Sequence, residues 1–460
     1  MADNPTSMRV PDAGVRSLFT LDSRWQAWLD VEAALAKAEA ELGVIPKDAA
    51  AIIVENSKLE LLDKANIEEG LIRTAHPLVP LIWELARICG DKAGGYVHWG
   101  ATTQNITQTG QLLLLRQAHH IFLSQIGRIL TVMAELAERT KDMALPGRTH
   151  GQHAVPATFG FKVGIWIDEL CRHVIRFREA EPRVFVAMLG GAAGTFASFG
   201  ELGPKIQASM AAHLEMQPMS APARTIGDHQ AEYVCLLGML AATCSKIARE
   251  IYTQMKQEFG EVEEPVPPGT VGSSTMPQKR NPKLTQDMVA AAAQVRALVP
   301  LALEAMQTEH EADRTTSLMI SHALQDACGQ TGDILSRMET MLAGLQVDEA
   351  RMRQNLDLSG GLLWEQRLCC HWGPISGVRK PMMRSTTPRK QLRQPEIHSI
   401  HCYPWINLSK PTLMQTKSRN CSIRLCIPAN VQQSHQNRQH GHGTLQVAWR
   451  ISTTNQAASG

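Results

Sequence analysis

The run GSSTMPQKRNP, residues Gly272–Pro282, contains two serines, two cations and two side-chain amides between glycine and proline residues. Gly269 and Gly272 can adopt backbone angles closed to other residues, and four nearby prolines exclude a helix from the stretch. Lys279 and Asn281, two residues apart, can face one side of an extended segment and bind a carboxylate there. The serines lie at the hinge, where backbone amides can form an anion-binding nest. The sequence predicts a loop that closes over an anion, and a solvated loop with a basic spot is the alternative.

Helical periodicity surrounds this run on both sides. The patterns over 226–259 and 283–310 flank it, and apolar residues recur at helical spacing from Asp22 to Leu42, with Gly43 and Pro46 as stop signals. Alternation of β-branched residues is almost absent, so the chain is predicted to be all-α. Several patterns approach or exceed 25 residues, which predicts a long helical bundle whose apolar faces need neighbours, and hence a homo-oligomer. Further helical patterns cover 64–90, 107–143, 156–190 and 315–343.

Length and composition indicate a soluble cytoplasmic protein of two or three domains. The chain has 460 residues and a formal charge of +2. Its N-terminus lacks the apolar core of a signal peptide, and no run of eighteen apolar residues could span a bilayer. Five cysteines are scattered in helical patterns without metal-ligand spacing, so buried reduced thiols are expected there: Cys89, Cys171, Cys235, Cys244 and Cys328.

The C-terminal stretch from Trp364 differs from the rest in composition. Residues 366–460 contain thirteen Lys or Arg and a single acid, Glu396, and frequent prolines break any helical pattern. A nucleic-acid-binding tail and a disordered spacer are two interpretations. The third is a frameshift, because the codons after Leu363, read one base earlier, allow the ordinary helical sequence MGAAVMLSL. We predict the frameshift, and therefore a low-order tail over 363–460 and no nucleic-acid partner.

Two further polar clusters lie next to helical patterns. HWGATTQNITQT, residues 98–109, places hydroxyls and amides before a helix, where they can cap it or present donors to an anion. GRTHGQHAVP, residues 147–156, is predicted to be a polar turn between two long helices. Isolated histidines such as His150 are more often structural or solvated than functional.

The order of the three clusters resembles that of the fumarase/aspartase superfamily. Residues 272–282 match its signature GSSxMPxKxNP at all eight fixed positions. Residues 98–109 align with HxGxTSxDxxDT, and residues 147–160 with GRTHxxxAxPTTFG, of the branch that contains adenylosuccinate lyase and 3-carboxymuconate cycloisomerase. His76 falls where adenylosuccinate lyases have another substrate-facing histidine. The resemblance covers residues from about 15 to 362.

The resemblance implies a fold of three mostly helical domains. The middle domain of the superfamily is a long bundle that forms a homotetramer, and each active site is assembled from three subunits. We therefore expect an N-terminal helical domain over 1–106 and a central lyase domain over 107–362, which carries the signature loop 269–282. The out-of-frame tail would replace the third domain, and no membrane partner is expected.

The chemistry implied is an adenylosuccinate-lyase-like β-elimination from a succinyl group, with release of fumarate. Ser273 would be the base that removes a proton next to a carboxylate, and His150 would protonate the leaving group. The dianionic intermediate must be stabilised, and neither a metal nor an organic cofactor is needed. The small dicarboxylate substrate would be bound by Lys279, Asn281, Thr102, Thr103, His98, His76, Thr149, Gln152, Ser274 and Met276.

Several positions depart from the adenylosuccinate lyase pattern. Gln286 stands where a glutamate orients the acid histidine, and Asn105 and Gln108 replace carboxylates. The run Gly227–Tyr233 lacks both arginines of the usual RDRHAEY, and around Glu309–Ser321 the arginines that would hold an AMP phosphate are out of register or replaced. A nucleotide phosphate without forked cations binds weakly. The alternatives are a 3-carboxymuconate-cycloisomerase-like reaction, an aspartate-adduct lyase and, in another class, a catalytically silent structural protein.

Overall fold

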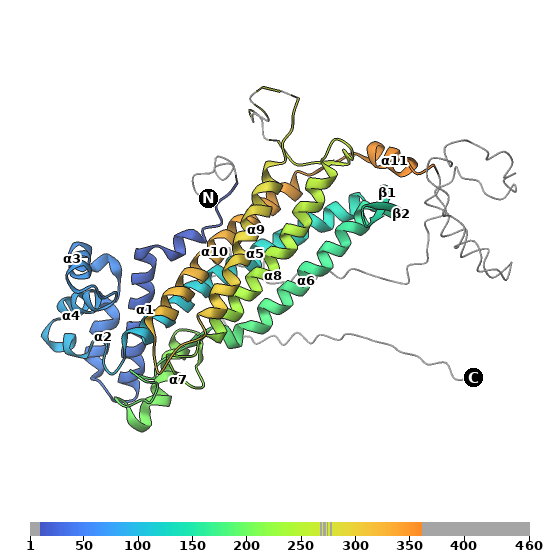
Figure 1. Ribbon diagram of the computed structural model, residues 1–460. Helices are drawn as coiled ribbons and strands as arrows, with labels where there is room; N and C mark the ends of the chain where they lie inside the picture. The colour runs from blue at the N-terminus through green and yellow to red at the C-terminus, as the bar shows by residue number, and fades with distance from the viewer. Residues whose placement is uncertain (1–9, 267–268, 270–272, 274, 277, 361–460) are drawn as a thin grey trace, which may run out of the picture. The chain divides into compact units, whose positions relative to one another are not determined.

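The computed structural model describes residues 10–266, 269, 273, 275–276 and 278–360. All of them belong to the first of two compact units, Met1–Ser409, and the second unit, Lys410–Gly460, lies outside the described residues. The described residues are mostly helical (Figure 1), which confirms the all-α prediction with a long central bundle. Ser274 and the predicted tail 363–460 lie outside the described residues.

From residue 10 to Tyr96, the described N-terminal region contains four helices and three short 3₁₀ turns. Thr20 caps the first helix by accepting the N–H of Ser23 at 3.3 Å. The single helix expected over 64–90 is two helices, because Ala75 has a left-handed φ of 52° and Pro77 follows two residues later. The helices are α1 (Leu21–Glu41), α2 (Lys47–Asn56), α3 (Lys64–Thr74) and α4 (Val79–Ala93), and the turns are η2 (Arg16–Phe19), η3 (Leu59–Leu61) and η4 (Gly94–Tyr96).

Five long helices form the bundle. Helix α8 packs along α9, α9 along α10, and α5 against both α6 and α10, so the apolar faces predicted from the sequence meet in one continuous core. The boundary expected at residue 106 falls in the first turn of α5. The bundle helices are α5 (Thr103–Arg139), α6 (Phe159–Val184), α8 (Asp228–Gln254), α9 (Lys283–Glu304) and α10 (Arg314–Ala343).

The remaining elements are short and lie between the bundle helices in sequence, except for β6 and α11, which follow α10. An antiparallel hairpin joins α5 to α6 in place of the simple polar turn predicted there. At the end of the bundle that carries this hairpin, α11 contacts β1 (Figure 1). The elements are β1 (Ala144–Thr149), β2 (Gln152–Thr158), β3 (Val186–Ala187), η5 (Gly200–Leu202), α7 (Gly203–His213), β4 (Gln217–Pro218), β5 (Val262–Glu263), β6 (Gln346–Val347) and α11 (Glu349–Asp357).

Helix α8 is the one described helix that is long and apolar enough to cross a membrane. However, 72% of its most apolar window is buried inside the protein, as expected for the central helix of a bundle. It packs against α6, α9 and α10. The apolar character of α8 is therefore explained by its place in the core.

The cysteines expected to be buried are so only in part. Cys89, Cys244 and Cys328 are buried, whereas Cys171 and Cys235 are half-buried. Burial raises the pKa of the Cys89 thiol to about 11 and that of Cys244 to about 12. These two side chains are therefore protonated packing residues at neutral pH.

Candidate functional site

The first turn of α5 presents the two candidate threonines, Thr102 and Thr103. Asn105, which is fully buried, accepts the backbone N–H of Thr102 at 3.1 Å and that of Gly191 at 3.1 Å. Its side chain therefore fixes the start of the helix against a loop that is distant in sequence. Thr102 and Thr103 themselves are only half-buried, so a ligand can reach them.

His76 is brought to this helix start from the loop before α4. Its Nδ1 accepts the backbone N–H groups of Leu78 at 3.3 Å and Val79 at 3.1 Å, and so caps α4. In that tautomer the ring proton is on Nε2, which lies 3.4 Å from the Thr103 hydroxyl. His76 and Thr103 together offer hydrogen-bond donors to an anion at the start of α5.

His98 is paired with a buried carboxylate. Its Nδ1 lies 2.6 Å from Oε1 of Glu32, and the Glu32 side chain is 1% exposed. Burial opposes protonation of His98, but the hydrogen bond and charge of Glu32 outweigh it and raise the pKa of the imidazole. His98 is therefore anchored to α1, and we call His76, His98, Thr102 and Thr103 the threonine cluster.

The second candidate group is at the tip of the β1–β2 hairpin. Thr149 and Gln152 are paired across the strands, and between them His150 and Gly151 have left-handed φ values of 51° and 75°. Such a two-residue turn matches the twist of a hairpin. The tip is exposed, and among the described residues His150 makes no hydrogen bond or ion pair. The imidazole is available to a ligand or to another subunit.

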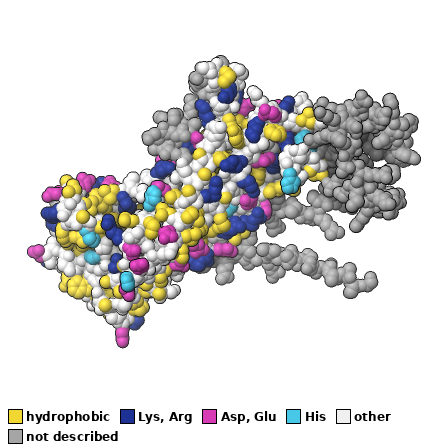
Figure 2. Space-filling model, in the orientation of Figure 1, with side chains coloured by type: hydrophobic (Ala, Val, Ile, Leu, Met, Phe, Trp, Pro, Cys, Tyr) yellow, Lys and Arg dark blue, Asp and Glu magenta, His cyan; other side chains and the backbone are white. Residues whose placement is uncertain are grey.

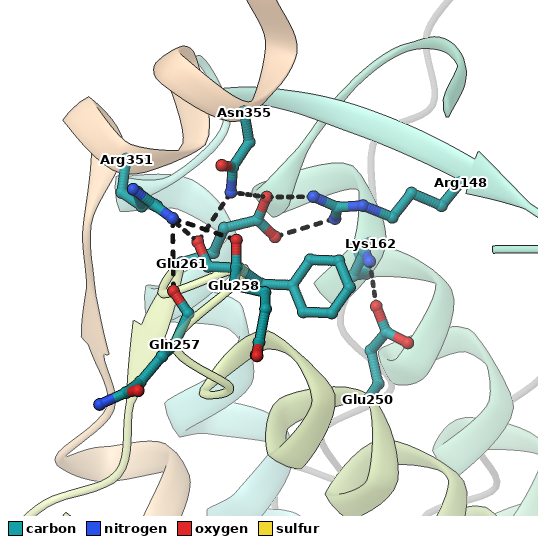
Figure 3. Close-up of polar contacts among 9 residues, drawn as sticks. Arg148, Lys162, Glu250, Gln257, Glu258, Glu261, Arg351 and Asn355 are labelled. Atoms are coloured by element: carbon teal, nitrogen blue, oxygen red, sulfur yellow. Dashed lines mark hydrogen bonds and ion pairs between the residues drawn. The ribbon is translucent and has the colours of Figure 1, made fainter. Parts of the chain in front are cut away.

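Arg148, next to this tip, joins the hairpin to the segment before the signature loop (Figure 3). Its two terminal nitrogens donate to the Glu261 carboxylate at 2.9 and 2.5 Å, and Glu261 is fully buried. Asn355 of α11 donates to the same carboxylate at 2.8 Å, and Arg351 donates to the backbone oxygens of Gln257, Glu258 and Phe259. This network holds the hairpin, α11 and the entry to the signature loop at one end of the bundle.

Glu264 connects the segment before the signature loop to the start of α9, which follows the loop. Its carboxylate accepts the N–H of Leu284 at 3.0 Å and that of Thr285 at 3.1 Å, in the first turn of α9. Burial, only partly offset by these hydrogen bonds, raises the pKa of the carboxyl group. The loop thus leaves and rejoins the bundle at one fixed point.

Within the loop, the Ser273 hydroxyl accepts hydrogen bonds from two backbone N–H groups. Its Oγ accepts the N–H of Thr275 at 3.4 Å and that of Met276 at 3.2 Å. Lys279 is exposed and makes no ion pair with any described residue. A cleft of 910 Å³ runs beside the loop, and three candidate substrate-binding residues line it: Met276, Lys279 and Asn281.

The candidate residues of one chain form two groups at opposite ends of the bundle. Helix α5 has 37 residues between Thr102 and the hairpin, a span of about 55 Å. Helix α9 begins directly after the signature loop and has 22 residues, a length of about 33 Å. Ala305, at its far end, lines a cavity together with Gln104, which directly follows Thr103. One chain therefore cannot bring the threonine cluster to Ser273 or His150.

Sequence reasoning missed the residues that hold the candidate groups in place. Glu261 and Glu264 lie in an acidic run before the loop, and Arg148 lies inside a recognised motif without an assigned role. The acidic run was the one sequence signal for Glu261 and Glu264. The partners of these two glutamates lie about 20 to more than 100 residues away in sequence, so no local pattern predicts the pairs. Gln286, at the position discussed above, is exposed on α9.

Comparison with known proteins gives consistent similarities. The sequence pattern of a family described as "Lyase" matches residues 7–297. The chain is 36% identical over 374 residues to N-acetyl-S-(2-succino)cysteine lyase of Dickeya dadantii, with 79% of this chain and 80% of the relative covered. It is 37% identical over 370 residues to adenylosuccinate lyase of Methanothermobacter thermautotrophicus, with 80% and 82% covered. The crystal structure of 3-carboxy-cis,cis-muconate lactonizing enzyme from Pseudomonas putida superposes with a TM-score of 0.74 at 32% identity, covering 80% of this chain and 83% of that one.

Proposed function

Because this chain belongs to the fumarase/aspartase superfamily and is an enzyme of lyase type, we propose that it catalyses β-elimination from a succinyl group and releases fumarate. Enzymes of this superfamily act on small dicarboxylates. The leaving atom would be nitrogen, as in the adenylosuccinate-lyase-like reaction predicted from the sequence, or sulfur, as the name of one relative indicates. The cytoplasmic location and the absence of a nucleic-acid partner stay predictions.

The observation that carries the proposal is the pair of backbone amides on Ser273. A serine hydroxyl is a weak acid, so a serine base needs donors that stabilise the alkoxide. The amides of Thr275 and Met276 already point at Oγ. The alkoxide would remove the proton next to the substrate carboxylate, and Lys279 with Asn281 would stabilise the dianion that forms.

Elimination also needs an acid for the leaving group. His150 would give its proton to the departing nitrogen or sulfur as the bond to carbon breaks, so that fumarate and a leaving group protonated at that atom result. Thr149 and Gln152 flank it at the hairpin tip. Thr102, Thr103 and His76 would bind the second carboxylate, with His98 anchoring the loop behind them.

We propose that subunits share each site within a homotetramer. The separation of the threonine cluster from the signature loop in one chain supports this. So do apolar side chains that one chain leaves exposed: Phe161, Ile165 and Ile175 on α6 are 66, 48 and 50% exposed. Figure 2 shows apolar side chains scattered among basic ones along the bundle, a pattern that further copies could cover.

A cycloisomerase acting on a 3-carboxymuconate-like substrate is the second candidate. The superposition on the Pseudomonas putida enzyme favours it. It uses the same carboxylate-binding groups, but it forms a ring and releases no fumarate. The two candidates therefore differ in product.

The test is a screen for fumarate, using adenylosuccinate, N-acetyl-S-(2-succino)cysteine and 3-carboxy-cis,cis-muconate as substrates. We expect fumarate from at least one succinyl adduct, and a fall in turnover of about 10²- to 10⁴-fold in Ser273→Ala with substrate binding retained. Thr275→Ala is the matched control, because it keeps the amide that donates to Ser273. Near-normal turnover in Ser273→Ala, or conversion of the muconate alone, would overturn the proposal.

A further inference from the structure

A small cavity of 150 Å³ lies beside the threonine cluster, where the starts of α5, α8 and α10 meet α1 and the end of α9. Gln104 directly follows Thr103, and Gln104, Gln108 and Gln111 share one face of α5 through their spacing of three and four residues. From α8, Gln230 donates to Gln111 at 3.3 Å. The cavity wall is therefore rich in side-chain amides.

Two arginines complete the wall without any acidic neighbour. Arg24 of α1 and Arg224 before α8 both line the cavity, and none of the described residues that line it is Asp or Glu. Burial lowers the pKa of both guanidinium groups, and Nε of Arg24 is buried with no hydrogen-bond partner among the described residues. Cations that are partly withdrawn from water without a counter-charge favour an anionic ligand.

Arg224 is held in position by its neighbours. Its Nε donates to Oε1 of Gln104 at 2.8 Å, while Nε2 of Gln104 donates to the backbone oxygen of Arg224 at 2.9 Å and to Gln108 at 3.0 Å. Nη1 donates to the backbone oxygen of Ala192 at 3.1 Å. Nη2 makes no hydrogen bond to a described residue, so this oriented nitrogen is available to a ligand.

The size of the cavity restricts the ligand. The volume of the cavity is 150 Å³. It is well below the roughly 300 Å³ at which pockets for larger organic ligands begin. The size of the cavity therefore favours a compact acid over a nucleotide.

We infer that this cavity is the leaving-group end of the site and selects a compact leaving group that carries a carboxylate and an amide, such as an N-acylated amino acid. Arg24 and Arg224 pair with the carboxylate, and the glutamine side chains hydrogen-bond to the amide, since they offer both a donor and an acceptor. The inference rests on the proposed β-elimination. It assigns the charge selection to Arg24 and Arg224, which lie outside the motifs quoted from the sequence.

Equilibrium binding to the full-length protein tests the inference without turnover. Calorimetry would compare N-acetylcysteine, its carboxamide and AMP. We expect N-acetylcysteine to bind at least about tenfold more tightly than either. Equal binding of acid and carboxamide, or tighter binding of AMP, overturns the inference.

Variants identify the residues responsible. Arg224→Gln and Arg24→Gln should each weaken the binding of N-acetylcysteine about 10- to 100-fold and leave the binding of the carboxamide unchanged. Arg224→Lys keeps the charge and should recover part of the loss, and Lys47→Gln, exposed on α2 and outside the cavity, should have no effect. Equal loss for acid and carboxamide would mean a purely structural role, and would contradict the inference.

The same experiment separates this inference from the proposed function. Ser273→Ala should bind N-acetylcysteine as the wild type does, because the binding needs no base. Charge-dependent binding without fumarate release from any adduct would reject the β-elimination, and with it the leaving-group role, while retaining the anion site. Fumarate release without charge-dependent binding would reject this inference alone.

Discussion

The threonine cluster and the signature loop present their polar groups in opposite ways. In the threonine cluster, His98 is paired with buried Glu32, His76 caps α4, and buried Asn105 fixes the backbone. In the loop, the described contacts of the Ser273 hydroxyl are the N–H groups of Thr275 and Met276, and Lys279 is exposed. In the first, side chains from α1 and α5 hold the polar groups in place, whereas in the second the described contacts lie at the base of the loop and within it. Loops fixed at their ends can close over a ligand.

The largest expected effect is recovery of activity in mixed oligomers. Thr103→Val and Ser273→Ala should each be nearly inactive alone. Refolded or coexpressed together, they should regain activity, because a site completed by different subunits then contains both intact groups in some copies. Fumarate release by the purified mixture measures this.

The control for mixing pairs two variants from the same end of the chain. Thr102→Ala with Thr103→Val should regain nothing, since every threonine cluster in the mixture then carries a defect. If the Thr103 and Ser273 variants also regained nothing while forming mixed oligomers, the shared site would be wrong, and the two ends could not be halves of one site.

A smaller effect is expected at the base of the loop. Arg148→Gln leaves the fully buried Glu261 carboxylate without its cation, so we expect a loss of about 3–5 kcal/mol in the free energy of unfolding. Urea denaturation measures this loss. Arg128→Gln removes an exposed pair with Glu339 and should change stability much less. Similar losses in both variants would show that the Arg148 network does not anchor the hairpin.

The smallest effect concerns Glu39, beneath the threonine cluster. Burial, and next the charge of Glu32, raise the pKa of Glu39 to about 9, and neither carboxylate oxygen has a hydrogen-bond partner among the described residues. The stability it contributes is therefore complete below pH 4.5 and is lost as pH rises towards 9. Glu39→Gln has no carboxyl group to ionise and so does not lose stability in this way. Between about pH 5.5 and about pH 7.5, its free energy of unfolding should therefore rise by roughly 2–3 kcal/mol relative to that of the wild type.

Denaturant midpoints at the two pH values measure the Glu39 effect. Glu41→Gln on the same helix is the control: hydrogen bonds from Ser209 and His213 lower the pKa of Glu41, so its carboxylate is ionised at both values. The free energy of unfolding of Glu41→Gln should therefore not rise relative to that of the wild type between these two pH values. A Glu39→Gln curve parallel to the wild type would show that Glu39 is already ionised in the folded protein.

Much of the fold follows from local sequence patterns. Helices α1, α5, α6, α8, α9 and α10 begin and end within six residues of the periodicities that predicted them, because an apolar stripe with a 3.6-residue period has few other ways to be buried. The split of 64–90 into α3 and α4 was missed, although Pro77 signals it. The β1–β2 hairpin was missed as well, since its strands contain Pro146, Pro156 and Gly147, residues that usually disfavour strands.

The sequence by itself determined the helical class, the superfamily and the identity of the candidate groups, because these depend on residue types at short spacing. Tertiary structure alone decided where those groups lie. The length of α5 separates Thr103 from His150, long-range pairs such as Arg148–Glu261 anchor the loop and hairpin together, and Arg24 joins Arg224 in one cavity although they lie far apart in the chain. No local sequence period predicts such long-range partners. They become neighbours only when the bundle packs, because burial of its apolar faces fixes which helix ends meet.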